Sequence, residues 1–383
     1  MPLDRAGRWL VDETQPDLWL YTDAESFVAG DRVAFRASCT VDTTATLTVT
    51  LDALAARIVH ESAPFAVGYN AAPAEAYATG CDWPVVYELT VSAEWPSGFY
   101  VVRGTAAGGE VVGEHFFVVR PPPTTIARPA KSANELLLLL STNTWRSYND
   151  WGGASAYEGV REGDLAAASN PETGMSIPFE DLMRGSHHLS FHRPISPGFI
   201  SVHPDAPRAA IPEQMPPRGT AAYDEFRQRH RERRQHAEGL TTFYFATGWA
   251  MYERHFALWA ERNGYTVHYA TNLDLHQQGE ALLSSYKCAV SVGHDEYWSA
   301  AMRRAADAFT LSGGQWARFA GNFMWQIRLE EDAEWAGDVE SAGTAAETRW
   351  HQVCYKYDYT ADPVYGKRRA TLLKRAPSRC CLE

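Results

Sequence analysis

The chain has 383 residues, of which 45% are hydrophobic and 12% are aromatic, and its formal net charge is −12. This length predicts two domains with room for a core in each, and the aromatic content excludes disorder along most of the chain. The acidic balance disfavours general binding to nucleic acid or to anionic lipid. It favours a small uncharged or cationic substrate.

The six cysteines have no regular spacing and form no C-x-x-C pair, so neither a zinc knuckle nor a disulfide framework is indicated. The longest apolar run, residues 136–140, is much shorter than the roughly 18–20 residues that span a bilayer. The first residues also lack the apolar segment of a signal peptide. We therefore expect a soluble, cytoplasmic protein without a membrane segment.

Residues 1–120 are expected to form a β-sandwich of the immunoglobulin-like type. Most of this region alternates apolar with small or polar residues, and Gly, Pro and Asp separate the alternating segments, which is typical of short strands. Three consecutive prolines then end the last strand, because proline has no amide hydrogen for the ladder. The Pro-rich residues 121–134 are therefore predicted to be a linker.

Residues 135–365 are expected to form an α/β domain, because apolar strands alternate there with helical segments. Strands are predicted at 135–142, 265–271, 288–293 and 315–322, and helices at 249–264 and 296–314. This order predicts a flavodoxin-like or Rossmann-like parallel sheet of the glutamine-amidotransferase-like type. An amidotransferase would lack its nucleophile, however, because Cys288 lies inside a predicted strand.

A long insertion, residues 150–240, separates the first strand of this domain from its helix, where 2–6 residues are typical. Its segment 223–238 carries five arginines, which suits a nucleic-acid or subunit contact but also a solvated helix. The acidic net charge favours the solvated helix. The tail, 366–383, is basic and contains cysteine, and it fits neither a continued α/β domain nor a cap.

Three polar turns follow predicted strands, at 143–153, 293–299 and 320–325. Ligands of open α/β sheets bind outside the carboxyl ends of the strands, so these turns form the candidate site. No G-x-S-x-G, P-loop or G-x-G-x-x-G motif is present after the first strand. Serine-triad hydrolysis, phosphoryl transfer and dinucleotide binding are therefore not indicated.

His294 and Glu296 lie two residues apart at a strand end, where both side chains can reach one metal or one water. Alternatively, Asp295 or Glu296 caps the following helix. Asn322 can donate to a substrate carbonyl or stabilise a turn. The residues alone leave these alternatives open.

Tyr148 lies beside two glycines, and its phenol either faces the same crevice or packs in a Tyr–Trp cluster. Tyr252 belongs to the apolar face of the predicted helix 249–264, so core packing is favoured there. Four further histidines are numerous enough for a metal cluster, but their irregular spacing favours surface or hydrogen-bonding roles. They are His187, His188, His192 and His203.

Together, these motifs resemble the large (beta) subunit family of N,N-dimethylformamidase, in its C-terminal catalytic-type domain. The similarity covers about residues 134–365 and is most specific in TW-x-x-YN-x-WGG and GHDEYWS. The family implies an enzyme that holds one non-haem iron through two tyrosines and one glutamate. It also implies hydrolysis of the C–N bond of small linear amides.

The resemblance assigns Tyr148, Tyr252 and Glu296 as metal ligands, and His294 and Asn322 as catalytic residues. Phenolate and carboxylate are hard anionic ligands that favour Fe(III), whose charge three such ligands neutralise. The metal would acidify a water and polarise the amide carbonyl. Asn322 would then stabilise the oxyanion, and His294 would pass a proton to the leaving amine.

Three points stay open from the sequence. Tyr157 and Tyr244 are alternatives to Tyr252 as the second tyrosine, because the insertion shifts the register. The alternative function is a catalytically silent member of the superfamily that binds a small ligand or a subunit, with the sandwich as an interaction module. Expected partners are a small amide substrate, a separate small subunit and, because a shortened domain exposes apolar surface, further copies in a homo-oligomer.

Overall fold

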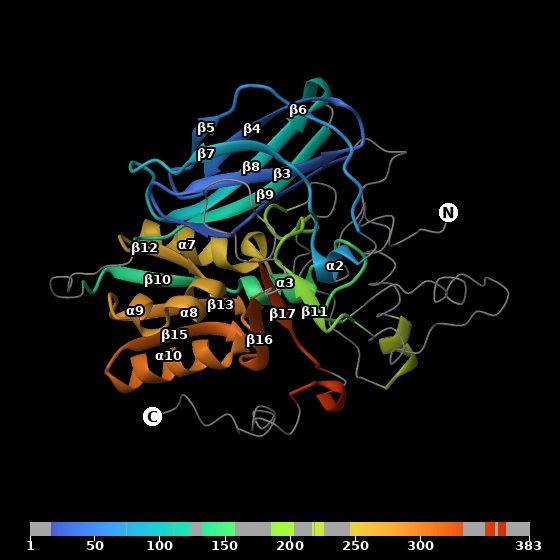
Figure 1. Cartoon of the computed structure of the whole chain (residues 1–383). Coiled ribbons are helices and arrows are strands. Elements are labelled where there is room, and N and C mark those ends of the chain that lie inside the picture. The colour runs from blue at the N-terminus through green and yellow to red at the C-terminus, as the bar shows by residue number, and fades with distance from the viewer. Residues whose placement is uncertain are drawn as a thin grey trace.

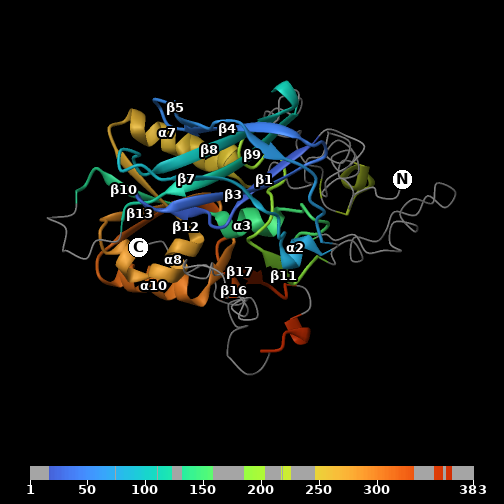
Figure 2. The same ribbon diagram turned by 45° about the horizontal axis from the view of Figure 1, so that its top comes forward.

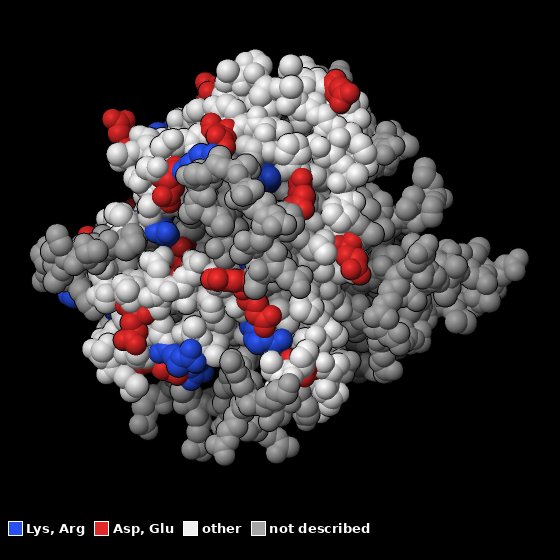
Figure 3. Space-filling view, viewed as in Figure 1, with Lys and Arg blue, Asp and Glu red and all other residues white. Residues whose placement is uncertain are grey.

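The computed structural model describes residues 17–73, 75–109, 111–122, 132–157, 185–202, 217, 219–225, 246–331, 349–356 and 359–364. Figure 1 shows the N-terminal strands above the strands and helices of the C-terminal part. On the face drawn in Figure 3, acidic and basic side chains of the described residues are interspersed over a mostly uncharged surface.

The N-terminal part contains two sheets that pack face to face. The first has the order β1-β3-β7: β1 (Leu18–Thr22), β3 (Arg32–Cys39) and β7 (Val85–Thr90). The second has the order β2-β9-β8-β4-β5, with β6 paired to β4: β2 (Ser26–Phe27), β4 (Thr43–Leu51), β5 (Arg57–Glu61), β6 (Phe65–Val67), β8 (Gly98–Ala106) and β9 (Val111–Val119). Phe35 of the first sheet and Phe117 of the second have ring centroids 6.4 Å apart. The prediction of a sheet-rich N-terminal region is confirmed.

The C-terminal part is built on a parallel sheet with the order β12-β10-β13-β15: β10 (Glu135–Leu140), β12 (Thr266–Thr271), β13 (Cys288–His294) and β15 (Gln315–Gly321). β10 is an inner strand whose five leucines are all buried, as the continuous apolar run of a sheet covered on both faces requires. The four predicted strands are confirmed. The closer description as flavodoxin-like or Rossmann-like stays a prediction.

Helices follow these strands: α3 (Thr142–Tyr148), α7 (Arg254–Arg262), α8 (Asn272–Gln278), α9 (Glu280–Leu283) and α10 (Ala300–Leu311). The helix predicted over 249–264 is present, but its first turn is the π-helical η2 (Trp249–Glu253). The helix predicted from residue 296 begins only at Ala300, because residues 297–299 form a short strand, β14 (Tyr297–Ser299). Short helical turns also occur at α2 (Ala76–Thr79), η1 (Ala107–Gly109) and η4 (Tyr359–Ala361).

A second small sheet, which the sequence analysis missed, has the order β11-β17-β16-β14 and includes β11 (His188–Ser190), β16 (Trp325–Glu331) and β17 (Trp350–Val353). Its strands are only three to seven residues long and come from separate parts of the chain. Figures 1 and 2 show α3 between the sandwich strands and the β16–β17 pair. This sheet therefore closes the side of α3 that faces away from the sandwich.

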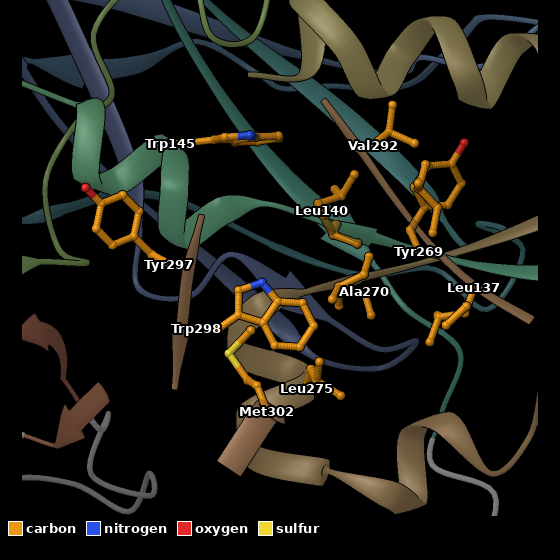
Figure 4. Close-up of a cluster of buried hydrophobic side chains, with 14 of the residues drawn as sticks. Leu137, Leu140, Trp145, Tyr269, Ala270, Leu275, Val292, Tyr297, Trp298 and Met302 are labelled. Atoms are coloured by element: carbon orange, nitrogen blue, oxygen red, sulfur yellow. The ribbon is translucent and has the colours of Figure 1, made fainter. Parts of the chain in front are cut away.

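The two parts share one hydrophobic cluster. Phe99 and Phe116 of the sandwich belong to the same core as the parallel sheet. Phe99 stacks on Trp249 with centroids 4.2 Å apart, and Phe116 meets Trp145 of α3 edge to face at 5.3 Å. Figure 4 shows Trp145 over Leu140 in this cluster. The sandwich is therefore packed directly onto the elements that follow β10.

Several sequence predictions concern residues outside the described part. These are residues 123–131 of the linker, most of the insertion with the arginine-rich residues 226–238, the tail 366–383, His203 and Tyr244. The division into domains at residues 120 and 135 stays a prediction. Within the part of the chain that the structure describes, no helix is both long and apolar enough to cross a membrane.

Replacing Leu138 by Ala is expected to lower the free energy of unfolding by about 2–5 kcal/mol, because a cavity would remain in the core. Leu311 on α10 is the matched control. Its side chain is 88% exposed, so Leu311→Ala should change stability by less than about 0.5 kcal/mol. Denaturant unfolding measures both variants, and equal losses would contradict the burial of β10.

Candidate functional site

Helix α3 carries the first site residue and is buried along its whole length. Thr144 accepts a hydrogen bond from the Glu296 amide through Oγ1 (3.0 Å), and Asn143 donates to the Tyr297 carbonyl through Nδ2 (3.1 Å). Trp145 donates to Glu253 Oε1 through its indole nitrogen (3.2 Å). Successive residues of the helix are thus tied to different elements, which fixes the helix end at Tyr148.

Two phenols meet one carboxylate at this helix end. Tyr148 and Tyr157 both donate to Glu296 Oε2, at 3.1 and 2.9 Å, and their hydroxyl oxygens lie 3.0 Å apart. The two rings stack with centroids 4.8 Å apart. The three oxygens therefore form a nearly equilateral triangle, and all three side chains are buried.

A tight turn brings the second phenol back to the first. Gly152 and Gly153 adopt φ angles of 86° and 107°, a region that is easily reached only by glycine. The chain then returns so that the Ala156 amide donates to the Ser147 carbonyl at 2.9 Å. The W-G-G signal of the sequence therefore marks the reversal that places Tyr157 beside Tyr148.

The structure brings Tyr157, one of the two alternatives to Tyr252, to Tyr148 and Glu296. Tyr252 lies in η2 against Gly293, where a side chain on the glycine would collide with the tyrosine ring. The phenol that accompanies Tyr148 on the Glu296 carboxylate is that of Tyr157. We therefore replace Tyr252 by Tyr157 as the candidate ligand, while the ligand role itself stays a prediction.

His294 and Asn322 adjoin the same carboxylate. His294 Nε2 lies 3.3 Å from Glu296 Oε2 and 3.1 Å from Asn322 Nδ2. His294 Nδ1 lies 3.2 Å from the Ala246 carbonyl oxygen. Since a carbonyl can only accept, Nδ1 carries a hydrogen and Nε2 is the nitrogen that faces the site. Asn322 is exposed at the end of β15, with a left-handed φ of 47°.

Lys356 is a site residue that the sequence analysis missed. Its ammonium donates to Tyr157 Oη at 2.7 Å, to Tyr297 Oη at 2.9 Å and to Glu296 Oε1. It lies just beyond β17, 60 residues from Glu296, in a stretch without a recognisable motif. Tyr297 donates its hydroxyl hydrogen to Tyr157 at 2.6 Å. It directly follows Glu296 in the sequence, so the H-x-E motif indicated its position.

The electrostatics of the site keep Glu296 ionised. Burial alone would raise the pKa of Glu296, but the His294 hydrogen bond and the Lys356 ammonium lower it to about 2. Burial and the neighbouring Tyr297, Tyr148 and Glu296 raise the pKa of the Tyr157 phenol far above its ordinary value. Without a metal ion beside it, Tyr157 therefore stays neutral even next to the Lys356 ammonium.

The helix-cap alternative for the H-x-E segment is wrong. Ser299 is the N-cap of α10, and its hydroxyl accepts from the Met302 amide at 3.3 Å. Asp295 is fully buried, and burial raises its pKa to about 7. Asp295 therefore lies in the protein interior, whereas His294 and Glu296 lie at the candidate site.

The residues present fit an oxygen-binding metal ion. The oxygens of Tyr148, Tyr157 and Glu296 lie 2.9–3.1 Å apart, the spacing of neighbouring ligands of one cation with bonds of about 2 Å. Two phenols and a carboxylate are hard donors that suit Fe(III), and a bound cation would favour the phenolate forms. Among the described residues, no group of three His, Cys, Asp or Glu is arranged for a metal.

The chain matches known proteins over most of its length. A family model described as N,N-dimethylformamidase beta subunit-like, C-terminal, matches residues 51–377. The N,N-dimethylformamidase beta subunit of Alcaligenes sp. is 23% identical over 290 residues, which is 75% of this chain and 33% of that protein. The subunit of the same name from Paracoccus aminophilus is 28% identical over 115 residues, which is 30% of this chain and 15% of that protein.

The chain thus spans a third or less of the curated relatives that it matches. Among solved structures, a family 123 glycoside hydrolase from Clostridium perfringens aligns over 85% of this chain and 73% of its own, with 9% identity and a TM-score of 0.13. That similarity is too low to support any conclusion about fold or function.

The low pKa of Glu296 predicts a pH dependence of stability in the metal-free protein. A carboxylate whose pKa falls from 4.5 to about 2 on folding stabilises the fold above pH 4.5, and this contribution is lost as the pH drops towards 2. Wild type should therefore exceed Glu296→Gln by up to roughly 3 kcal/mol at neutral pH, and by little near pH 2.

Denaturant unfolding across this pH range measures the difference. Glu94→Gln is the control. Glu94 is exposed in the sandwich, so this variant should show the same pH dependence of unfolding free energy as wild type. A difference between wild type and Glu296→Gln that does not change with pH would contradict the ionised, buried state of this carboxylate.

Proposed function

Because the chain belongs to the N,N-dimethylformamidase beta subunit-like, C-terminal family, we propose that it hydrolyses the C–N bond of small linear amides related to dimethylformamide, with iron as cofactor. The observation that carries this proposal is the triangle of oxygens from Tyr148, Tyr157 and Glu296, with His294 beside it. A hard cation is the ligand that this set of donors suits best.

Tyr148, Tyr157 and Glu296 would hold the iron. Two phenolates and one carboxylate carry three negative charges, which balance Fe(III) and suit a neutral amide substrate. When bound, the metal supplies Lewis acidity, polarising the amide carbonyl and lowering the pKa of a water molecule. The buried surroundings strengthen these interactions, because little solvent screens them.

His294 transfers the proton in this proposal. Its Nδ1 hydrogen is held by the Ala246 carbonyl, so the ring keeps one orientation and presents Nε2 to the site. Nε2 takes the proton of the attacking water and returns it to the nitrogen of the departing amine. An amine leaves readily only when its nitrogen is protonated, so this step controls the cleavage of the C–N bond.

Asn322 binds the substrate oxygen in this proposal. Its amide group adjoins His294 Nε2 at 3.1 Å and lies on the exposed side of the site, where a substrate can approach. A donor held at this position stabilises the negative charge that develops on the carbonyl oxygen.

Lys356 binds only one of the two oxygens of the Glu296 carboxylate. Its ammonium pairs with Oε1, while Oε2 faces Tyr148, Tyr157 and His294. The lysine therefore orients the carboxylate so that one oxygen is directed to the metal position. Such outer partners of a ligand usually matter for metal affinity as well as for orientation.

The alternative proposal is a catalytically silent member that binds a small ligand or a subunit. One observation favours it: the Lys356 ammonium already gives Glu296 and Tyr157 a cationic partner, so the cluster is charge-balanced without a metal. Iron content separates the two proposals.

The relatives are named as beta subunits, and we propose a separate partner subunit and a homo-oligomer in either case. A cytoplasmic location likewise stays a prediction.

Tyrosine-to-phenylalanine variants test the iron site. Wild type should hold about one iron per chain and show a visible phenolate-to-iron band, and Tyr148→Phe and Tyr157→Phe should each lose most of both. Tyr252→Phe is the matched control and should keep them. Elemental analysis and absorption spectra decide the matter, and a wild type that stays colourless and metal-free after iron loading would favour the silent alternative.

Substitution of His294 tests the proton transfer. His294→Ala should retain iron and lose amide hydrolysis by roughly 10²–10⁴-fold, because a general acid–base contributes on that order. His60→Ala is the control, since His60 pairs with Tyr87 in the sandwich and should leave turnover unchanged. Iron loss in His294→Ala would instead make this histidine a ligand, and retained turnover would remove it from the mechanism.

A further inference from the structure

The sandwich contributes one acidic side chain to the buried face of α3. Glu25 immediately precedes β2, and its backbone carbonyl accepts from the Val118 amide at 2.8 Å. Its carboxylate forms an ion pair with Arg146, whose side chain is 4% exposed. This pair therefore joins the edge of the sandwich to the helix that carries Tyr148.

Arg146 is held on its other sides as well. Its Nη1 donates to the Ser190 carbonyl at 3.1 Å, and its guanidinium lies 3.4 Å from the centre of the Phe191 ring. Ser190 belongs to β11, which pairs with β17. Arg146 thus connects the sandwich, α3 and the small sheet from which Lys356 extends.

Arg146 and Tyr148 are two residues apart on a helix, so their side chains point to nearly opposite sides. The arginine faces the sandwich and the tyrosine faces Glu296. A rotation or shift of α3 that broke the Glu25 pair would therefore also move the phenol. The Arg146 side chain is 4% exposed and that of Glu25 is 14% exposed, so each charge depends on the other for a partner.

We propose that Glu25 is a positioning residue of the candidate site: through its buried ion pair with Arg146 it fixes helix α3, and thereby the Tyr148 phenol. The sandwich is then a structural part of the site instead of an independent interaction module. The consequence for iron affinity rests on the proposed function, whereas the consequence for α3 does not.

A second ion pair between the same two parts provides a matched control. Arg120, at the end of β9, donates to Asp274 of α8 through Nε at 2.8 Å, and Asp274 is nearly as buried as Arg146. Glu25→Gln and Arg120→Gln each remove one charge from a sandwich-to-helix pair. Only the Glu25 pair includes a residue of α3.

Hydrogen–deuterium exchange of the metal-free protein tests the positioning of α3. In Glu25→Gln, the amides of residues 142–157 should exchange about tenfold faster or more, because the helix opens locally. In Arg120→Gln, the same amides should change only as much as the global stability does. Equal exchange of residues 142–157 in both variants, after correction for global stability, would overturn the proposal.

Glu25→Gln leaves Arg146 buried without its acid partner, which can unfold the chain. The double variant Glu25→Gln/Arg146→Met removes both charges and avoids this penalty. The alternative is that Glu25 serves only to neutralise the buried Arg146 and does not position α3. In that case, the amides of residues 142–157 in the double variant would exchange as they do in wild type. The proposal predicts that faster exchange persists there even when the melting temperature recovers, and wild-type exchange in the double variant would overturn it.

Iron binding gives the second measurement. The double variant should bind iron 10–100-fold more weakly than wild type, the range typical for residues that orient a ligand, while Arg120→Gln should bind it as wild type does. If wild type binds no iron but the exchange results hold, the proposed function fails and the positioning role of Glu25 stands. If wild type binds iron and the double variant binds it equally well, the link between Glu25 and the phenol is overturned.

Discussion

The structure depends on the complete burial of α3, a helix of seven residues placed directly after the central strand β10. Besides Tyr148, this helix has four hydroxyl or amide side chains and one arginine, and buried polar groups of this kind are stabilised by hydrogen-bond partners. Those partners come from the sandwich, the small sheet and the turn after β13. The need to satisfy α3 therefore brings separate parts of the chain together at the site.

The same constraint explains the electrostatics of the site. Tyr148, Tyr157 and Tyr297 form a buried cluster of phenols around the Glu296 carboxylate, and burial raises the pKa of Tyr157 and Tyr297. Lys356 compensates its charge from one side, and His294 approaches it from the other. In the proposed iron site, a bound cation would stabilise the carboxylate and the deprotonated phenols together.

Much of this arrangement can be predicted from local sequence patterns, whereas the rest depends on contacts between residues far apart in the sequence. The leucines of β10 and the H-x-E segment after β13 follow from strand periodicity and sheet topology, which also place Tyr148 near Glu296. Tyr157 lies beside Tyr148 because the glycine turn at the start of the long insertion returns the chain. Lys356 contacts Glu296 across 60 residues of sequence, and Glu25 contacts Arg146 of α3 across 121 residues. No local pattern encodes contacts over such separations.

A crystal structure of the iron-loaded protein, with an anomalous difference map at the iron edge, tests the central claim most directly. We expect one strong peak within about 2 Å of the hydroxyl oxygens of Tyr148 and Tyr157 and of Glu296 Oε2. A peak bound to Tyr252 in place of Tyr157, or iron bound only elsewhere on the chain, would contradict it.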